Sequence, residues 1–196
     1  MSSAKDNLRR EALIRRAELT TQARADKSEA AIRHLLQTPV FQASSTVAIY
    51  IPLKVELALD RLLTVAGDLA HRFVAPRVLA EGQMSFHEVT KNSTLQQGYG
   101  NIREPAVTAS QVNIDDIDLF LVPLAACDRR GNRLGFGGGF YDRALRNQRG
   151  FKLGVGFSVQ LVEHIERESH DVTLDGFICE DGAVYFNRGP KPAHKQ

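Results

Sequence analysis

Short, mainly apolar runs alternate with segments of helical periodicity along most of the sequence. The runs are TVAIYIP (46–52), RFVAP (72–76), DLFLVP (118–123) and KLGVGF (152–157). Continuous apolar runs of this length are typical of strands that are buried on both faces, as in parallel sheets. Right-handed crossovers place the connecting helices on both faces of such a sheet, so the alternation predicts an α/β fold with a mostly parallel sheet.

Helices are expected between and around these runs. Residues 4–24 have high helix propensity, and DKSE at 26–29 has the pattern of a capping box that would open a second helix ending at Leu36. Helical spacing of apolar residues predicts further helices within 57–69, 140–148 and 159–168. The other expected segments are an exposed strand at 83–89, a loop at 90–113 and a final strand pair at 174–180 and 183–186.

The composition favours one globular domain over residues 1–186, followed by a polar tail at 187–196. The 196 residues are 43% apolar and 24% charged, and their formal charge of +2 is too balanced to favour nucleic-acid binding. Two distant cysteines, Cys127 and Cys179, are expected to be reduced and buried. The N-terminus is charged, and no apolar run approaches the ~20 residues that span a bilayer. We therefore expect a cytoplasmic monomer with neither nucleic-acid nor membrane partners.

The stretch GNRLGFGGGFYDRAL, residues 131–145, holds five of the fifteen glycines within nine positions. Glycine adopts positive φ without penalty and lets a ligand approach the backbone, so this stretch can turn several N–H groups toward one anion. A helix is expected to begin at Phe140, and its N-terminal N–H groups would favour phosphate. A tight connection that needs only turns explains the glycines equally well. The spacing matches neither the P-loop nor the Rossmann pattern.

Cations and carboxylates accompany this glycine stretch. Arg133 and Arg143 flank its loop GFGGG, residues 135–139. Lys5 and Arg9 lie four residues apart on the first predicted helix, where a solvated face is the ordinary explanation. Asp142 has the chemistry of a Mg²⁺ ligand but would also favour a first helical turn.

A second carboxylate ligand would have to come from elsewhere in the chain. HDVTLD (170–175) offers Asp171 or Asp175, although either also suits a turn. Phe140 and Tyr141 would stack on a flat heterocycle, and Glu56 would accept hydrogen bonds from its N–H groups, but all three are also ordinary core and helix-start residues.

With these motifs together, the sequence resembles the 5-formyltetrahydrofolate cyclo-ligase family, also called 5,10-methenyltetrahydrofolate synthetases, over nearly its whole length. The segments that carry the resemblance follow the family's order: AKDNLRREAL, VAIYIPLKVE, FVAP, IREP, DLFLVPLAACD, GNRLGFGGGFYDRAL and HDVTLDGFICE. The glycine stretch is the specific signature. The resemblance implies a three-layer α/β/α fold with a mostly parallel sheet, similar to sugar-phosphate isomerases and CoA transferases.

The resemblance also implies roles for individual residues. The expected ATP-binding residues are Lys5, Arg9, Arg133, Leu134, Gly135, Phe136, Gly137, Gly138, Gly139, Phe140 and Tyr141. The expected folate-binding residues are Ile51, Glu56, Phe140 and Tyr141, and the expected Mg²⁺ ligands are Asp142 and Asp171. No Ser/His/Asp or Cys/His arrangement is assigned, so no catalytic side chain is predicted.

The activity implied by the resemblance is the ATP- and Mg²⁺-dependent cyclisation of 5-formyltetrahydrofolate to 5,10-methenyltetrahydrofolate, with release of ADP and phosphate. Its partners would be small molecules, the folate and ATP. Two alternatives stay open from the residues alone. One is an ATP-independent enzyme of similar fold that acts on sugar phosphates or thioesters, and the other is a folate- or nucleotide-binding protein without turnover.

Overall fold

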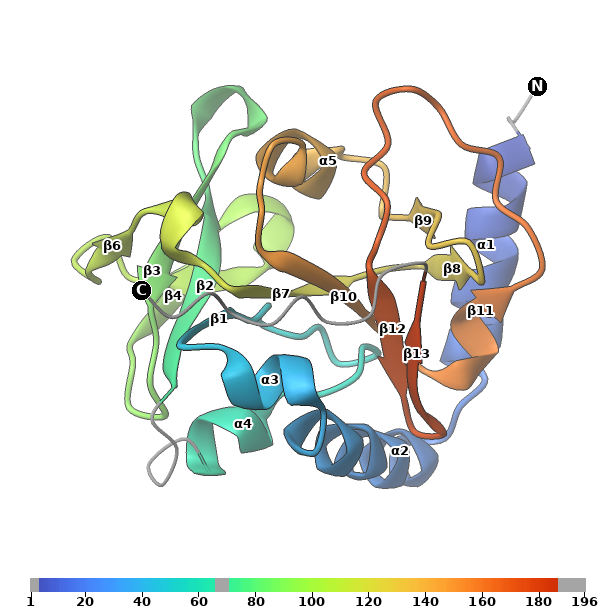
Figure 1. The fold of residues 1–196 in the computed structure, drawn as a ribbon, viewed down its shortest axis with the longest axis horizontal. Coiled ribbons are helices and arrows are strands. Elements are labelled where there is room, and N and C mark those ends of the chain that lie inside the picture. Colours follow the sequence, from blue (N-terminus) through green and yellow to red (C-terminus); the bar gives the residue numbers. More distant parts are fainter. Residues whose placement is uncertain (1–3, 66–70, 187–196) are drawn as a thin grey trace.

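An eight-stranded mixed sheet forms the centre of this computed structural model, which describes residues 4–65 and 71–186 (Figure 1). Its strands, in spatial order, are β13 (Gly182–Tyr185), β12 (Gly176–Cys179), β10 (Phe151–Val155), β7 (Leu119–Pro123), β1 (Thr46–Ala48), β2 (Arg72–Val78), β3 (Met84–Glu88) and β6 (Gln111–Val112). The central strands β12, β10, β7, β1 and β2 run parallel, while β13 and β3 are antiparallel to their inner neighbours. The predicted mostly parallel sheet is confirmed.

The order of the parallel strands reverses beside β1. The chain forms β1, adds β2 on one side, and then returns to add β7, β10 and β12 on the other side. The register places Val47 of β1 opposite Phe73 of β2 and Leu119 of β7. In doubly wound sheets, ligands bind outside the carboxyl ends of the strands at such a reversal. The strand order therefore indicates a ligand site beside the segments that follow β1 and β7.

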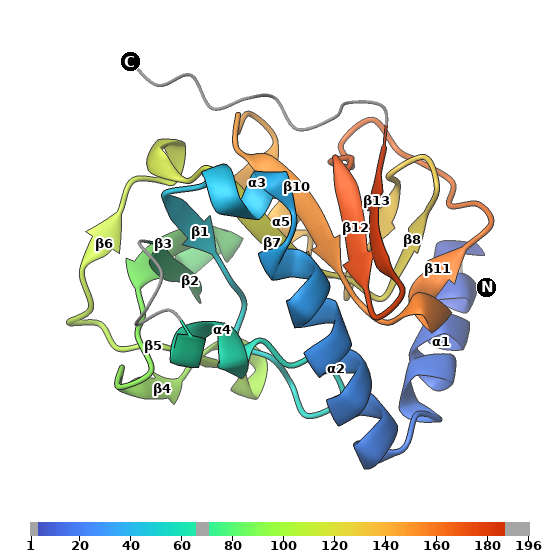
Figure 2. The same cartoon turned by 60° about the horizontal axis from the view of Figure 1, so that its bottom comes forward.

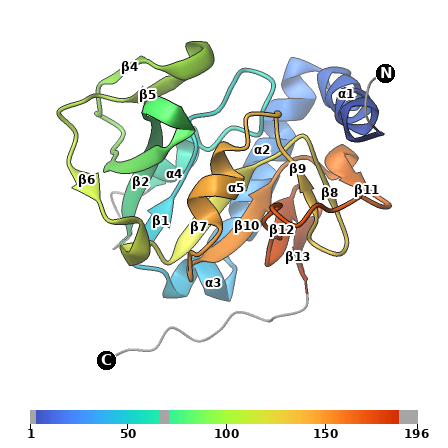
Figure 3. The same ribbon diagram turned by 90° about the horizontal axis from the view of Figure 1, so that it is seen from above.

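Helices lie on both faces of the sheet. Figures 1 and 2 show α2 (Thr21–Leu36), α3 (Pro39–Ala43) and α4 (Asp60–Val65) on one face, and Figure 3 shows α5 (Phe140–Leu145) over β7 and β10 on the other. Each face of the sheet has its own core cluster, because neighbouring residues of a strand point to opposite faces. Leu121 packs in the cluster under α2, α3 and α4, and its neighbour Val122 packs in the cluster that contains Leu145 of α5. The expected three-layer α/β/α fold is confirmed.

Helix α1 (Ala4–Ala17) packs against a smaller sheet rather than the central one. This sheet contains β11 (Leu161–Val162), β8 (Ala126–Asp128) and β9 (Arg133–Leu134). Ala12 is fully buried among Ala125, Leu134 and Ile165. Because β9 lies within the glycine stretch and leads directly into Gly135–Gly139, this packing fixes α1 beside these glycines.

The first two helices differ from their predicted bounds. The chain leaves the helical conformation after Ala17, and α2 begins at Thr21 rather than at the predicted capping box. Thr20 is the N-cap, because its hydroxyl accepts a hydrogen bond from the Ala23 N–H at 3.1 Å. The expected continuous helix over residues 4–24 and the capping box at 26–29 are therefore wrong.

The helix predicted at 159–168 is also wrong. A 3₁₀ turn spans Ser158–Gln160, and β11 follows it and pairs with β8. The buried Gln160 side chain donates to Leu124 O at 2.7 Å and to Ala125 O at 3.1 Å. These tertiary bonds outweigh the local helix propensity.

Other expectations differ in extent. The segment predicted as a loop contains the hairpin β4 (Leu95–Gln97) and β5 (Arg103–Pro105), and strand β6. The ladder of β1 ends at Ala48, four residues before the predicted end of that strand. The pair β12 and β13 is confirmed, and both cysteines are buried free thiols. The expected tail at 187–196 and the end of the expected helix at 57–69 lie outside the described residues. Over the described residues, no helix has the length and apolar character that a bilayer span requires.

Candidate active site

A cavity of about 680 Å³ lies at the carboxyl ends of β1, β2 and β7. Tyr50 and Ile51 follow β1, Pro76 belongs to β2, and Pro123 ends β7. The glycine stretch, α1 and the β4–β5 hairpin complete its walls. Every residue predicted to contact ATP, folate or Mg²⁺ lines this cavity. The fold therefore brings together side chains from both ends of the chain at the strand reversal.

The segment Gly135–Gly139, called the glycine loop below, forms an open loop along one wall of this cavity. Gly137 has a φ of 98° and Gly139 a φ of 63°, conformations that side chains rarely adopt. Within the described residues, the N–H groups from Phe136 to Tyr141 donate to no protein acceptor. A loop that only turned the chain would satisfy some of these donors internally. Over the part of the chain that the structure describes, the loop thus has a run of unpaired backbone donors beside the cavity.

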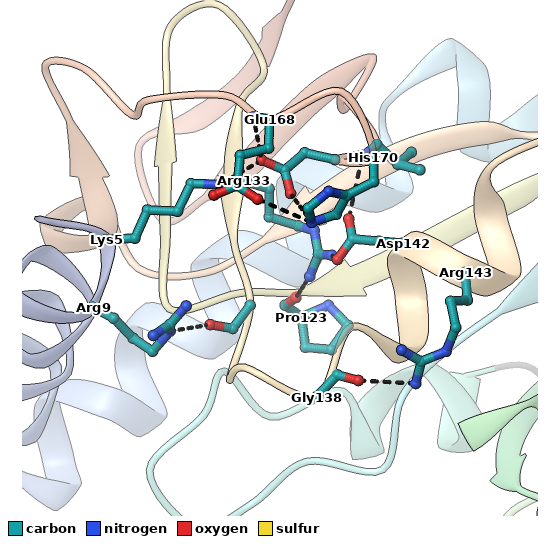
Figure 4. Close-up of polar contacts among 12 residues, drawn as sticks. Lys5, Arg9, Pro123, Arg133, Gly138, Asp142, Arg143, Glu168 and His170 are labelled. Carbon is teal, nitrogen blue, oxygen red and sulfur yellow. Dashed lines mark hydrogen bonds and ion pairs between the residues drawn. The ribbon is translucent and has the colours of Figure 1, made fainter. Parts of the chain in front are cut away.

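Two cations of α1 reach this side of the cavity (Figure 4). The Arg9 Nε–H donates to Gly135 O at 2.9 Å, and Arg9 also pairs with Asp6. Lys5 Nζ lies 2.7 Å from Asp171 Oδ2 and 3.1 Å from Glu168 Oε1. The predicted cations Lys5 and Arg9 are therefore held at the pocket and not on a solvated face.

The Lys5–Asp171 contact favours the charged form of both partners. Burial disfavours the lysine ammonium, but the hydrogen bonds to Asp171 and Glu168 outweigh it and raise the pKa of Lys5. Burial likewise opposes ionisation of Asp171, yet the Lys5 hydrogen bond and the Glu168 N–H lower the pKa of that carboxyl.

Arg133 and Arg143 support the loop from two sides. The buried Arg133 donates to Asp142 Oδ2 at 2.9 Å and to Pro123 O at 3.4 Å, which ties the loop to the end of β7. Arg143 donates to Gly138 O at 2.9 Å and to Gly82 O at 3.1 Å. Its guanidinium also lies 5.2 Å from the centre of the Phe140 ring.

The two predicted metal ligands belong to adjacent parts of the site. Asp171 forms a group with Glu168 and His170, whose ligand atoms all lie within 4.8 Å of one another. Asp142 is outside this group, but its Oδ1 accepts a hydrogen bond from the Val172 N–H at 3.2 Å. Sequence reasoning missed Glu168, because it falls in a segment that was predicted to be helical.

Asp175, the alternative second ligand, is used elsewhere. Its Oδ2 accepts from the Lys152 N–H at 2.9 Å, and it does not line the cavity. The choice left open between the two aspartates of HDVTLD therefore favours Asp171.

The other half of the cavity is more apolar. Glu56 is buried there and accepts from the Leu53 N–H through Oε2 at 2.9 Å. Burial raises the pKa of Glu56, and the Leu53 N–H and Arg16 offset this rise only in part. Phe140 packs edge-on against Tyr99 with ring centres 5.0 Å apart. Tyr99 is a further pocket residue that sequence reasoning missed, because it lies in the supposed loop.

The fold and this pocket define a doubly wound α/β protein with a ligand site at the strand reversal. A family model described as the 5-formyltetrahydrofolate cyclo-ligase family matches residues 1–180. The chain belongs to this family, which confirms the expected membership and the expected class of enzyme, a ligase.

Individual relatives agree with this result. The chain is 29% identical to the 5-formyltetrahydrofolate cyclo-ligase of Escherichia coli over 170 residues, which cover 84% of this chain and 93% of that protein. The NMR structure of Aquifex aeolicus 5,10-methenyltetrahydrofolate synthetase has a TM-score of 0.85 and 33% identity over 99% of this chain and 98% of that one. A 5,10-methenyltetrahydrofolate synthetase from Mycoplasma pneumoniae, at 24% identity, shares the fold with a TM-score of 0.73, over 91% and 99% of the two chains.

Proposed function

We propose that the chain converts 5-formyltetrahydrofolate to 5,10-methenyltetrahydrofolate, using ATP and Mg²⁺ and releasing ADP and phosphate. One observation carries the ATP requirement: the N–H groups from Phe136 to Tyr141 have no acceptor among the described residues and belong to a loop that lines the cavity. Converging backbone N–H groups bind phosphate in many unrelated proteins. The family membership supports the folate substrate.

The nucleotide would occupy the part of the cavity between α1 and the glycine stretch. Lys5, Arg9 and Arg133 would neutralise its phosphates, because all three line this wall. A Cβ added at Gly137 would meet no protein atom within 4 Å, so the space beside this glycine is open to a phosphate group. The residues that we assign to ATP are therefore those expected from the family, Arg133–Tyr141 together with the two cations of α1.

The carboxylates fit a Mg²⁺ ion. Mg²⁺ takes hard oxygen ligands and usually combines one or two carboxylates with phosphate oxygens and water. Asp142 and Asp171 offer such oxygens at the same end of the cavity, and Glu168 adds another beside Asp171. We assign the ion to Asp142 and Asp171, with Glu168 as a further candidate. When bound, Mg²⁺ would neutralise charge on the phosphates.

The folate would occupy the apolar half. Its ring would lie near Ile51 and the Phe140 and Tyr141 rings, and Glu56 would accept hydrogen bonds from its N–H groups. The buried side chains of this half, such as Tyr50 and Glu56, would limit the access of water to the reacting atoms. Tyr99 and Phe140 would form one edge of the ring site.

The reaction needs positioning more than acid–base groups. The formyl oxygen attacks the γ-phosphorus of ATP, the bond to ADP breaks, and the formyl oxygen becomes a phosphate ester. N10 then attacks the same carbon and gives up its proton, and phosphate departs with that oxygen and takes up the proton, which leaves the methenyl bridge. Aligned oxygens and fixed cations supply most of the acceleration in phosphoryl transfer. This agrees with the lack of a predicted nucleophile among the pocket side chains.

The remaining parts of the proposal concern the whole chain. We infer one domain over residues 1–186 that acts as a monomer in the cytoplasm, with small molecules as its only partners. The nearly balanced charge supports the exclusion of nucleic acid.

The decisive experiment mixes the protein with 5-formyltetrahydrofolate and MgATP and follows the near-ultraviolet absorbance of the methenyl product. Separate reactions leave out ATP, Mg²⁺ or the folate, and ADP is measured in each. We expect absorbance and ADP to rise together only in the complete mixture. Product formed without ATP would indicate an ATP-independent enzyme, and binding without any product would indicate a protein that only binds folate or nucleotide.

A further inference from the structure

Arg16 is a buried cation behind the cavity that none of the assignments above uses. It lies in the last turn of α1, and its side chain is 6% exposed. Arg16 Nε is buried and has no hydrogen-bond partner among the described residues. Burial lowers the pKa of Arg16, because the surroundings oppose its charge. A buried cation with an unsatisfied donor reduces stability, so a residue of this kind calls for a functional explanation.

One contact of Arg16 points to the folate half of the cavity. Arg16 Nη1 lies 3.7 Å from Glu56 Oε1, and the Glu56 side chain is 7% exposed. The other oxygen of Glu56 accepts from the Leu53 N–H. The charge that favours ionisation of Glu56 comes from Arg16. Glu56 in turn raises the pKa of two buried hydroxyls, those of Tyr50, which follows β1, and Tyr141, on α5. Arg16 is therefore the cation that faces this carboxylate.

A second contact points to the nucleotide half. The Arg16 guanidinium lies 5.4 Å from the centre of the Phe136 ring, within the range of a cation–π interaction. Phe136 is 46% exposed and belongs to the glycine loop that lines the cavity. This contact holds one face of a ring that is otherwise largely exposed. Arg16 thus supports a loop residue on one side and a carboxylate on the other.

We propose that Arg16 is a positioning residue that serves both halves of the cavity. It holds the Glu56 carboxylate toward the folate, and it fixes the position of Phe136 in the glycine loop. This inference deepens the proposed function and rests on it for the identity of the two ligands. The role is distinct from a purely structural ion pair, since it requires that loss of Arg16 affects both Glu56 and ATP binding.

The first test measures Glu56 directly in the protein without ligands. Carboxyl ¹³C resonances of labelled glutamates are titrated with pH, and the Glu56 signal is identified by its loss in Glu56→Gln. Removal of an opposite charge at this distance should raise the midpoint of Glu56 by about one pH unit or more in Arg16→Met. Arg16→Lys keeps the charge, so its Glu56 midpoint should stay close to that of the wild type. Arg15→Met, the same change at the neighbouring exposed position, should leave the midpoint unchanged.

The second test measures ATP binding by calorimetry. We expect Arg16→Met to weaken ATP binding several-fold, and Arg15→Met to leave it unchanged. If Arg16→Met does not fold, Arg16→Met/Glu56→Gln is compared with Glu56→Gln, because removal of both charges avoids an unpaired buried carboxylate. The double variant should then bind ATP several-fold more weakly than the single one.

An unchanged Glu56 midpoint in Arg16→Met, or equal ATP affinity in the compared variants, overturns the proposal for Arg16. Failure of the proposed function is recognised separately. A wild-type protein that forms no methenyl product, or binds no ATP, rejects that function, and the ¹³C titration then decides on Arg16 alone.

Discussion

Lys5 Nζ and Asp171 Oδ2 lie 2.7 Å apart although 166 residues separate them in the sequence. This contact joins α1 to the segment that follows β11 and closes one end of the cavity. It places a cation and a candidate metal ligand side by side, at the end of the site assigned to the phosphates. In the proposed function, this pair would link the N-terminal helix to nucleotide binding.

Lys5→Ala should impair the use of ATP more than it impairs folding. A hydrogen bond to a charged group contributes about 1.5–3 kcal/mol, so we expect the KM for ATP to rise about tenfold or more. The partly exposed ion pair should contribute about 1 kcal/mol or less to the free energy of unfolding. Steady-state kinetics and urea unfolding measure the two effects. Arg10→Ala, an exposed change on the same helix, is the control, and equal kinetics for both variants would remove Lys5 from the site.

Gly137→Val should separate backbone strain from obstruction of the ligand. The φ of 98° makes any side chain at this position strained, and the new Cβ would occupy the space assigned to phosphate. Gly182→Val is the matched control, because Gly182 also has a positive φ of 123° and open space beside it but does not line the cavity. Both variants should lose about 1–3 kcal/mol of stability. Only Gly137→Val should lose ATP affinity, so equal affinities in calorimetry would argue against a phosphate at the loop.

Asp128 should make the turn before the glycine loop sensitive to acid. Burial opposes its ionisation, but hydrogen bonds from the Asn132 side chain and from the N–H groups of Ile165, Asn132 and Arg130 outweigh this and lower the pKa of Asp128. For a carboxyl whose pKa is lowered on folding, the contribution to stability is complete above the ordinary value of 3.8 and is lost as the pH falls through the lower folded value.

Asp128→Asn should therefore lower the free energy of unfolding by about 2–3 kcal/mol at pH 7, because an amide cannot accept all of these bonds. The difference from the wild type should shrink as the pH falls below 3.8. Urea unfolding between about pH 3 and 7 measures both effects. Asp116→Asn, at an exposed position, serves as the control. A difference that stays constant with pH would show that ionisation of Asp128 does not stabilise the turn.

The sequence predicted the central strands well because their signal is local. Runs such as DLFLVP are apolar at consecutive positions, and only a strand between two neighbours buries Leu121 and Val122 on opposite faces. The helix predicted at 159–168 failed because its outcome depends on distant groups. Gln160 donates to carbonyls of Leu124 and Ala125, which no local pattern reveals.

Residues of the site likewise divide into those with a local sequence signal and those that only the fold brings together. The glycines and the two arginines beside them are contiguous, so an anion site could be considered from the residues, although a simple turn explained them equally well. Their expected role in ATP binding came from the family resemblance. Glu168 and Tyr99 were missed because they reach the cavity only through the fold. Arg16 was missed because only the fold buries it behind the cavity, against Glu56. Arg16 in particular belongs to a run of charges on α1 that reads as a solvated face, and only its burial distinguishes it from Arg15.

Arg143 should hold the glycine loop open from its outer side. Its guanidinium bridges Gly138 O in the loop and Gly82 O, which follows β2, and it packs over the Phe140 ring. With the Gly138 carbonyl fixed in this way, the neighbouring N–H groups remain available to a ligand. Loss of the bridge lets the loop adopt other conformations, so part of the binding energy is used to order it again.

We expect Arg143→Ala to raise the KM for ATP about fivefold, which corresponds to about 1 kcal/mol, and to leave the KM for the folate within about twofold. Arg143→Lys should be intermediate, because a single ammonium cannot reproduce the planar fork that reaches two carbonyls. Arg146→Ala, an exposed change at the end of the same helix, should behave as the wild type. If the alanine variants at 143 and 146 have the same KM for ATP, the bridge between Gly82 and Gly138 has no part in nucleotide binding, and the order of the loop must come from Arg9 and Arg133 instead.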